Sequence, residues 1–216
     1  MENLKMELNV VENDLLLVDS KVFKSQLKVR KAQPKDVQGI YNVAYTVGKS
    51  KKDSTQGFLM DDYSSDPKYF QKKILENILK LEHFYIAETI NNKVVGFLMA
   101  YTKDLWLEHD PNWIKEVNWH PSFDMKRLDN FVVIDKTAIY APLTGRGIGS
   151  RLYKSLISDI LSKGIHNIFA ETIINPVPNF ASLSFREKQN YILAGTRYYE
   201  AYKDTVYTDL IYYKSV

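Results

Sequence analysis

The sequence contains no cysteine among its 216 residues. This absence excludes disulfide bonds, thiolate metal sites and a cysteine nucleophile. No run of 18 apolar residues occurs, and the N-terminal segment carries acidic residues where a secretory signal peptide needs basic ones. We therefore expect a cytoplasmic protein that does not interact with a membrane.

A strong charge of either sign is also missing, because 29 basic and 26 acidic residues leave a net charge of +3. No DNA- or RNA-binding motif accompanies this mild charge, so no nucleic-acid partner is expected. His109 and His120 have no second histidine or carboxylate at ligand spacing, so we predict no metal site. An apolar content of 45% is ordinary for one globular domain with a full core.

Residues 131–164 carry the clearest pattern in the chain. A β-branched segment predicts a strand that ends before Pro142, and a turn rich in glycine follows it. Apolar residues then recur with a period near 3.6, at Ile148, Leu152, Tyr153, Leu156, Ile157, Ile160 and Leu161. This spacing predicts an amphipathic helix that is closed by Gly164.

The glycine-rich turn between this strand and helix suits an anionic ligand. Glycines let the backbone approach closely, and the N–H groups at a helix start favour a phosphate or pyrophosphate. A P-loop would need a lysine directly after Gly149, and a dinucleotide site would need GxGxxG. Neither pattern is present, because Gly145, Gly147 and Gly149 give GxGxG.

The segment Thr144–Gly149 resembles the pyrophosphate loop [Q/R]xxGxG/A of the GNAT superfamily of N-acetyltransferases, with Thr144 where the family usually has Gln or Arg. A predicted strand at 168–173 follows the helix. The segment after it is similar to the family's next helix, N-x-x-[AS]-x-x-x-x-E-K-x-G-F, with matches at Asn179, Ser182, Glu187 and Lys188. In order and spacing the resemblance covers roughly residues 27–216, which leaves residues 1–26 as an N-terminal extension.

The resemblance implies a mixed α/β fold of the GNAT type. Its sheet would have six or seven mostly antiparallel strands, splayed at the centre, with helices on both faces. The residue patterns themselves predict helices at 35–47 and 66–81, a hairpin of strands 84–90 and 94–101 around Asn91-Asn92, and final strands at 191–199 and 206–213.

Acetyl-CoA is the co-substrate that the resemblance implies, with no metal. The cofactor-binding residues would come from the central strand, the glycine-rich turn and the second helix. They are Thr137, Ala138, Ile139, Tyr140, Thr144, Gly145, Arg146, Gly147, Ile148, Gly149, Ser150, Asn179, Ser182, Phe185 and Arg186. Asn179 would bond the pantetheine arm of the cofactor.

Acetylation of an amine needs a base, because an amine with a pKa of about 10.4 is protonated at neutral pH. Asp135 on the central strand and Glu171 at the carboxyl end of the next strand are the candidates, since ligands of open α/β sheets lie at the carboxyl ends of strands; the alternative for each is a structural salt bridge or a surface acid. Arg186 stands where the family often has a tyrosine that protonates the leaving thiolate. Arginine cannot donate that proton, but it could stabilise a thiolate or bind a CoA phosphate.

The expected function is transfer of an acetyl group from acetyl-CoA to the primary amine of a small molecule, directly within a ternary complex. Family branches that acetylate small amines, such as phosphinothricin acetyltransferases, also lack the tyrosine. Acetylation of a protein N-terminus or lysine, or CoA binding without turnover, stays open as an alternative. The protein would be a monomer or a homodimer.

Two further segments have open interpretations. The insertion 103–130 holds all three tryptophans of the chain, Trp106, Trp113 and Trp119. It predicts either a wall of the acceptor site or a hydrophobic cluster under a long loop. In the polar segment 48–65, Phe58 and Tyr63 could face a substrate, although packing is the simpler interpretation.

Overall fold

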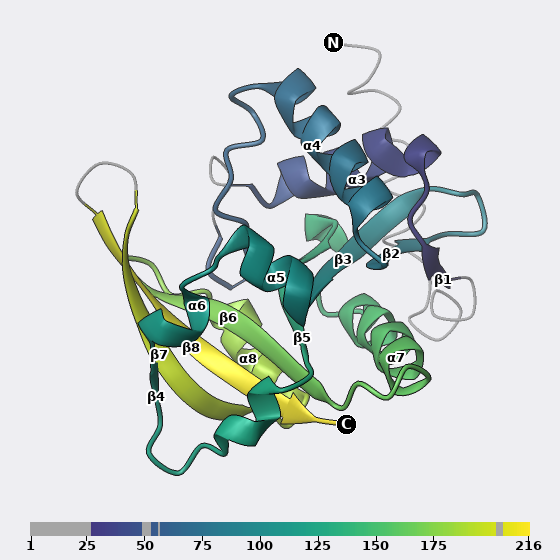
Figure 1. The fold of residues 1–216 in the computed structure, drawn as a ribbon. Helices are drawn as coiled ribbons and strands as arrows, with labels where there is room; N and C mark the ends of the chain where they lie inside the picture. Colours follow the sequence, from purple (N-terminus) through teal and green to yellow (C-terminus); the bar gives the residue numbers. More distant parts are fainter. Residues whose placement is uncertain (1–26, 49–52, 56, 202–204) are drawn as a thin grey trace.

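The computed structural model describes residues 27–48, 53–55, 57–201 and 205–216 (Figure 1). These residues form one eight-stranded sheet with the strand order β1-β2-β3-β5-β6-β8-β7-β4. In chain order the strands are β1 (Lys28–Lys31), β2 (His83–Glu88), β3 (Val94–Thr102), β4 (Val117–Trp119), β5 (Val132–Ile139), β6 (Asn167–Asn175), β7 (Ile192–Ala201) and β8 (Thr205–Ser215). Every pairing is antiparallel except that of β5 with β6.

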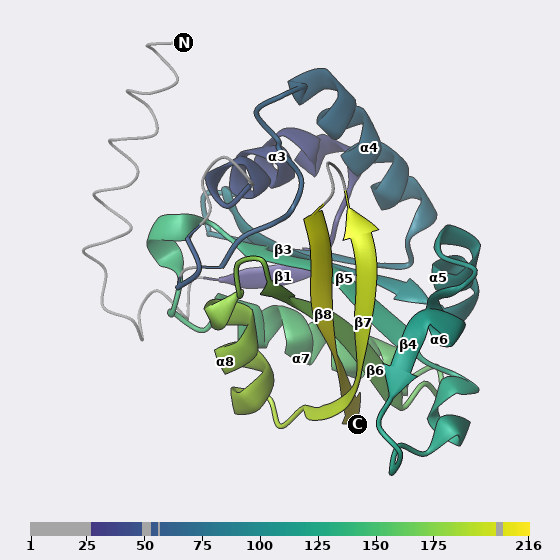
Figure 2. The same ribbon diagram turned by 90° about the vertical axis from the view of Figure 1, so that its left-hand side faces the viewer.

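Helices cover both faces of this sheet. They are α3 (Val37–Thr46), α4 (Pro67–Lys80), α5 (Lys103–His109), α6 (Trp113–Glu116), α7 (Ile148–Leu161) and α8 (Phe180–Lys188), with short 3-10 turns η1 (Pro34–Asp36), η3 (Met125–Leu128) and η4 (Ala141–Leu143). Figure 2 shows α3 and α4 on the side of β1 and β3 opposite to α7. The predicted mixed α/β fold with a mostly antiparallel sheet is confirmed.

Most of the predicted elements form where the sequence places them. Asp66 accepts a hydrogen bond from the Tyr69 backbone N–H, 3.0 Å away, and so caps α4 as its position before Pro67 predicts. Gly164, with a φ of 70°, follows the end of α7. The predicted extension 1–26 lies outside the described residues, so the domain boundary at residue 27 stays a prediction.

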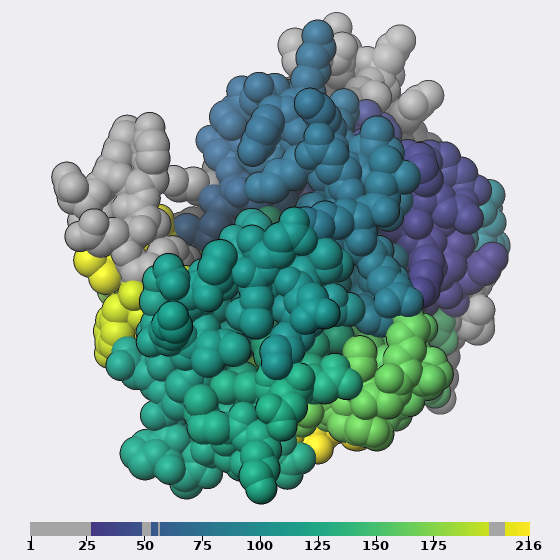
Figure 3. All heavy atoms as spheres, in the orientation of Figure 1, coloured from purple at the N-terminus to yellow at the C-terminus, as the bar shows by residue number. Residues whose placement is uncertain are grey.

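The insertion 103–130 is more ordered than a loop, because it forms α5, α6, β4 and η3. Strand β4 pairs with β7 at the sheet edge, and it explains why the sheet has eight strands rather than the expected six or seven, counted over the described residues. In Figure 1 the insertion lies in front of β6 and β8, and Figure 3 shows its side chains forming much of that surface.

The two central strands separate part of the way along their length. Parallel pairing between β5 and β6 covers only Val132–Ile134 and Ile168–Ala170. Beyond these residues β5 stays paired with β3 while β6 stays paired with β8, so the sheet opens between them. The predicted splay at the centre of the sheet is confirmed. The two predicted acids, Asp135 and Glu171, lie where the strands begin to separate.

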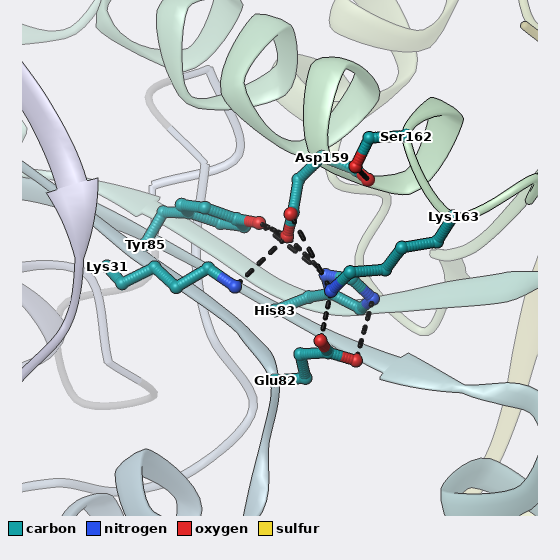
Figure 4. Close-up of polar contacts among 7 residues, drawn as sticks. All are labelled: Lys31, Glu82, His83, Tyr85, Asp159, Ser162 and Lys163. Atoms are coloured by element: carbon teal, nitrogen blue, oxygen red, sulfur yellow. Dashed lines mark hydrogen bonds and ion pairs between the residues drawn. The ribbon is translucent and has the colours of Figure 1, made fainter.

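A polar network fastens the far end of α7 to the first strands (Figure 4). Asp159 accepts hydrogen bonds from the Tyr85 hydroxyl and from His83 Nδ1, the latter at 3.0 Å, and lies 3.2 Å from Lys31 Nζ. Lys163 pairs with Glu82 across the same gap. The network therefore connects the C-terminal part of α7 to β1 and β2. None of the helices in the described segments is long and apolar enough to cross a membrane.

Candidate active site

A cavity of about 550 Å³ lies where β5, α7 and α8 meet. Twelve of the fifteen predicted cofactor-binding residues line it: Thr137, Ala138, Ile139, Thr144, Gly145, Gly147, Ile148, Gly149, Ser150, Ser182, Phe185 and Arg186. Tyr140, Arg146 and Asn179 are not among its lining residues. The structure thus brings together the strand, the glycine-rich turn and the second helix, as the sequence predicts.

The glycine-rich turn has the backbone geometry that an anion site needs. Gly145 and Gly147 both have a φ of 82°, a region that other residues enter at a cost of about 1 to 2 kcal/mol. Gly147 is the N-cap of α7, and no side chain caps the helix there. The N–H groups of the first helical turn therefore stay available to a ligand in the cavity.

Four polar side chains in the cavity wall are themselves incompletely bonded. The hydroxyl oxygens of Thr137, Thr144 and Tyr153 are buried and have no hydrogen-bond partner among the described residues. Nε and Nη1 of Arg186 are in the same condition, and the residue is only 6% exposed. Buried polar groups cost free energy unless a partner satisfies them. A polar, anionic ligand such as CoA fits this wall.

Asn179 uses both ends of its side chain within the protein. Its Oδ1 accepts a hydrogen bond from the Ser182 backbone N–H at 3.2 Å, and its Nδ2 donates one to the Phe58 carbonyl at 3.0 Å. The residue caps α8 and holds the loop before α4 against it. Its predicted bond to the pantetheine arm stays a prediction. Tyr140, which is 6% exposed, packs beneath Lys93, whose Nζ lies 5.1 Å from its ring centroid.

Sequence reasoning missed one wall of the cavity. Val47, Thr55 and Gly57 line it, as does Phe58, for which packing had been the simpler interpretation. The Ala181 backbone N–H donates to the Ser54 carbonyl at 3.0 Å and ties this loop to α8. The loop lies more than 120 residues from α8 in the chain, so no local spacing signals the contact. Tyr63, by contrast, is a core residue at 4% exposure.

Asp135 and Glu171 occupy corresponding positions on β5 and β6, one residue beyond the last paired residues Ile134 and Ala170. Asp135 also falls in a bulge, because Met99 and Ala100 of β3 pair with Lys136 and Ile134 and leave it out. Both carboxylates therefore stand at the point where the strands separate.

Glu171 has an environment that suits a base at neutral pH. Burial, assisted by the negative charges of Asp209 and Asp135, raises its pKa from 4.5 to about 7. A hydrogen bond from Trp113 Nε1, 2.6 Å from Oε1, and the charge of Arg197 oppose this rise. A carboxyl with a pKa near 7 can accept a proton and release it again at the working pH.

Asp135 has a different environment, because a cation lies beside it. Lys136 Nζ is 3.6 Å from Asp135 Oδ2 and 2.9 Å from Asp61 Oδ2. Burial disfavours the charge of Lys136, but the two carboxylates outweigh burial and raise its pKa. Asp135 is thus part of an ion-paired group, while its charge also reaches Glu171. Of the two predicted acids, Glu171 is better suited to remove a proton.

The insertion forms a hydrophobic cluster, the second of its two interpretations. Trp113 is fully buried and meets Trp106 and Trp119 with ring centroids 6.0 and 5.5 Å apart. The cluster packs on Phe169 of β6.

Within the described residues, no group of three or more His, Asp and Glu side chains is placed to hold a metal ion.

Comparison with known proteins agrees with this geometry. The model of the Acetyltransferase (GNAT) family matches residues 52–191. The chain belongs to this family of acetyl-CoA-dependent N-acetyltransferases. No curated protein sequence matches it significantly.

Solved structures show the same fold at low sequence identity. A Drosophila melanogaster polyamine N-acetyltransferase is 11% identical with a TM-score of 0.60, over 88% of this chain and 100% of the other. PaiA N-acetyltransferase from Thermoplasma acidophilum, in complex with coenzyme A, is 16% identical with a TM-score of 0.57, over 88% and 99%. Chaetomium thermophilum Naa20, in complex with a bisubstrate analogue, is 14% identical with a TM-score of 0.56, over 88% and 86%. At these identities the likeness supports the fold alone.

Proposed function

We propose that the protein transfers the acetyl group of acetyl-CoA to the primary amine of a small molecule, directly within a ternary complex. The observation that carries the proposal is the position of Glu171. It is a carboxyl with a pKa of about 7, placed where β5 and β6 separate, and β5 also supplies Thr137, Ala138 and Ile139 to the cavity that suits CoA.

Glu171 lies on the face of the sheet that carries the insertion, and it does not line the cavity. Successive residues of a strand point to opposite faces. Phe169 packs under Trp113 of the insertion, so Glu171, two residues later, shares that face. Thr137, Ala138 and Ile139 of β5 line the cavity together with the first residues of α7. An amine that enters the opening between β5 and β6 beside Glu171 would therefore meet this carboxylate before it meets the cofactor.

The residues divide the chemistry between them. When bound, acetyl-CoA supplies an acetyl thioester; its C–S bond breaks as the amide C–N bond forms, and CoA leaves as a thiolate that takes up the second proton lost by the acceptor nitrogen. Ionised Glu171 accepts a proton from the ammonium group of the acceptor, which frees its lone pair. The first turn of α7 and Gly145–Ser150 bind the pyrophosphate, and Arg186 stabilises negative charge in the cavity. The sequence has no cysteine, so the acetyl group cannot be transferred through a thiol of the protein.

Two features support a small cationic acceptor. The charges of Asp135 and Asp209 beside Glu171 favour an ammonium group over a neutral or anionic one. The chain has Arg186 where the family often has a tyrosine, and it resembles in this the branches of the family that acetylate small amines. A polyamine acetyltransferase stands among the structural neighbours, although Naa20 does as well.

A kinetic screen tests this proposal. Acetyl-CoA is offered with monoamines, diamines, peptides with a free N-terminus and lysine peptides, and CoA thiol release is followed together with the mass of the product. We expect acetylation of small primary amines and intersecting initial-velocity lines. Transfer only to peptides would contradict the small-molecule acceptor, parallel lines would contradict direct transfer, and binding of acetyl-CoA without any transfer would contradict catalysis.

A further inference from the structure

Trp113, on the insertion, makes a direct contact with the carboxylate of Glu171. Its Nε1 donates a hydrogen bond to Oε1 at 2.6 Å, and the indole ring is fully buried. Phe169 and Phe131 pack against the ring with centroids 5.7 and 5.8 Å away, which fixes the direction of its N–H group. A hydrogen bond to an ionised acceptor is about twice as strong as one between neutral groups.

Arg197 of β7 makes the second contact with the same oxygen. Its Nη1 lies 3.5 Å from Glu171 Oε1. Its Nη2 lies 2.7 Å from Asp110 Oδ2 and 2.5 Å from Glu116 Oε2. Asp110 and Glu116 both belong to the insertion, so the insertion orients this guanidinium group as well.

Both contacts are made to Oε1 of Glu171, so Oε2 stays available to accept a proton. Within the described residues, Trp113 and Arg197 both reach Oε1, and no hydrogen bond or ion pair ends on Oε2. A carboxylate that is held through one oxygen keeps a fixed orientation for the other. The side chain of Glu171 is 23% exposed, which leaves a path for a proton from the acceptor.

We propose that Trp113 and Arg197 are positioning residues, which the insertion 103–130 places so that Oε2 of Glu171 faces the acceptor amine. This inference rests on the proposed function, in which Glu171 removes the proton. In this proposal the insertion holds the Oε1 side of the Glu171 carboxylate, and it does not form the wall of the acceptor site.

Three charged groups and one neutral hydrogen-bond donor, from four elements, act on Glu171 in addition to burial. Asp135 on β5 and Asp209 on β8 raise its pKa, whereas Trp113 on α6 and Arg197 on β7 lower it. Loss of the hydrogen bond from Trp113 would remove stabilisation of the ionised form only. The pKa of Glu171 should therefore rise further, by about one pH unit for a charge-assisted hydrogen bond.

The first test replaces Trp113 with phenylalanine. Trp113→Phe should move the acidic limb of the kcat/KM profile upward by about one pH unit, with unchanged affinity for acetyl-CoA. Trp119→Phe is the matched control, because Trp119 lies in the same cluster but donates its Nε1 hydrogen bond to the Ile114 carbonyl at 2.9 Å. The control should leave the limb in place; an equal displacement in both variants would overturn the assignment.

A second variant keeps the test decisive if Trp113→Phe does not fold. Arg197→Lys retains the charge and loses the planar fork that reaches Asp110, Glu116 and Glu171 together. It should lower kcat about tenfold while KM for acetyl-CoA stays unchanged. Arg127→Lys is its control, because Arg127 is 46% exposed, pairs with Asp124 and lies 6.0 Å from the Tyr213 ring centroid, without an ion pair to Glu171. A kcat equal to that of the control would count against positioning by Arg197.

A direct titration separates this inference from the proposed function. The carboxyl carbon of Glu171, labelled with ¹³C and assigned by its loss in Glu171→Gln, is followed by NMR from pH 4 to pH 9. Its titration should move upward in Trp113→Phe. If it does not move in either Trp113→Phe or Arg197→Lys, the positioning proposal is wrong. If it moves and the pH–rate profile does not follow, Glu171 is not the base, and the proposed function loses its main support.

Discussion

Gly147 and Gly164 stand at the two ends of α7, and both have a positive φ, of 82° and 70°. Their backbone conformations are nearly the same, but their surroundings differ. Gly147 lies in the wall of the cavity at the N-terminus of the helix. Gly164 follows the C-terminus, and a Cβ atom added there would meet no atom of the described residues within 4 Å. Substitutions at the two positions should therefore cause similar backbone strain, but only the one at Gly147 should affect a ligand in the cavity.

Gly147→Glu should abolish CoA binding and leave the fold intact. The new carboxylate would occupy the turn and repel the pyrophosphate, while the left-handed conformation costs about 1 to 2 kcal/mol. Gly164→Glu carries a similar strain and should bind CoA normally. Isothermal titration with CoA and thermal unfolding of both variants measure the difference. Unchanged CoA affinity in Gly147→Glu would show that the turn does not bind the pyrophosphate.

Glu171→Gln should lose turnover by about 100-fold or more, because general base catalysis contributes roughly 10² to 10⁴ in rate. Affinity for acetyl-CoA should change little, since Glu171 is not among the residues that line the cavity. In the unchanged protein, kcat/KM should rise with pH through an apparent pKa of about 7. Full activity of the variant would exclude Glu171 as the base.

Asp135→Asn distinguishes the second predicted acid from the first. Removal of its charge should lower the pKa of Glu171, so the acidic limb of the kcat/KM profile should move to lower pH. The maximal rate should fall much less than in Glu171→Gln. The pH–rate profiles of the two variants are compared under the same conditions. A rate loss as large as that of Glu171→Gln would make Asp135 a catalytic group in its own right.

The sequence predicts the elements whose signals are local. The apolar spacing of α7, the position of Gly164 and the cap at Asp66 each depend on residues within a few turns of one another, and each is found as expected. Strand β4 carries no such signal, because its three residues form a strand only by pairing with β7.

The same limit applies to the site. Gly145, Gly147 and Gly149 could be identified as lining residues because their spacing lies within five positions. The environment of Glu171 could not be predicted, since Trp113 is 58 residues away in the chain and Arg197 and Asp209 come from other strands. A carboxylate on a strand was visible in the sequence, but the groups that set its pKa meet only in the folded protein.

Asp159→Asn should destabilise the protein at pH 7. Burial alone would raise the pKa of Asp159, but hydrogen bonds from Tyr85, Lys31 and His83 outweigh burial and lower it from 3.8 to about 2. A depressed native pKa stabilises the fold above pH 3.8, and this contribution is lost as the pH falls toward 2. It corresponds to about 2 kcal/mol at pH 7.

Urea unfolding at pH 7 and at pH 3 measures this effect of Asp159. The destabilisation by Asp159→Asn should be smaller at the lower pH. Glu76→Gln breaks an exposed pair with Lys72 on α4 and should change the free energy of unfolding by less than about 0.5 kcal/mol at either pH. A destabilisation by Asp159→Asn that does not depend on pH would show that lost packing, and not charge, is responsible.

Glu171 should have the opposite effect on stability, because its native pKa is raised. The fold holds the proton of Glu171 more tightly than the unfolded chain does, so ionisation between pH 4.5 and about 7 weakens the native state. Above pH 7 the cost approaches about 3 kcal/mol, at about 1.4 kcal/mol for each tenfold change in proton affinity.

Glu171→Gln removes the ionisation, so its stability relative to the unchanged protein should increase from pH 5 to pH 8. Glu82→Gln is the control, because the hydrogen bond from Lys163 lowers the pKa of Glu82 below 4.5 and its effect on stability should therefore not change from pH 5 to pH 8. Urea unfolding across this range measures both, and a pH-independent difference for Glu171→Gln would mean that Glu171 has an ordinary pKa and no special fitness as a base.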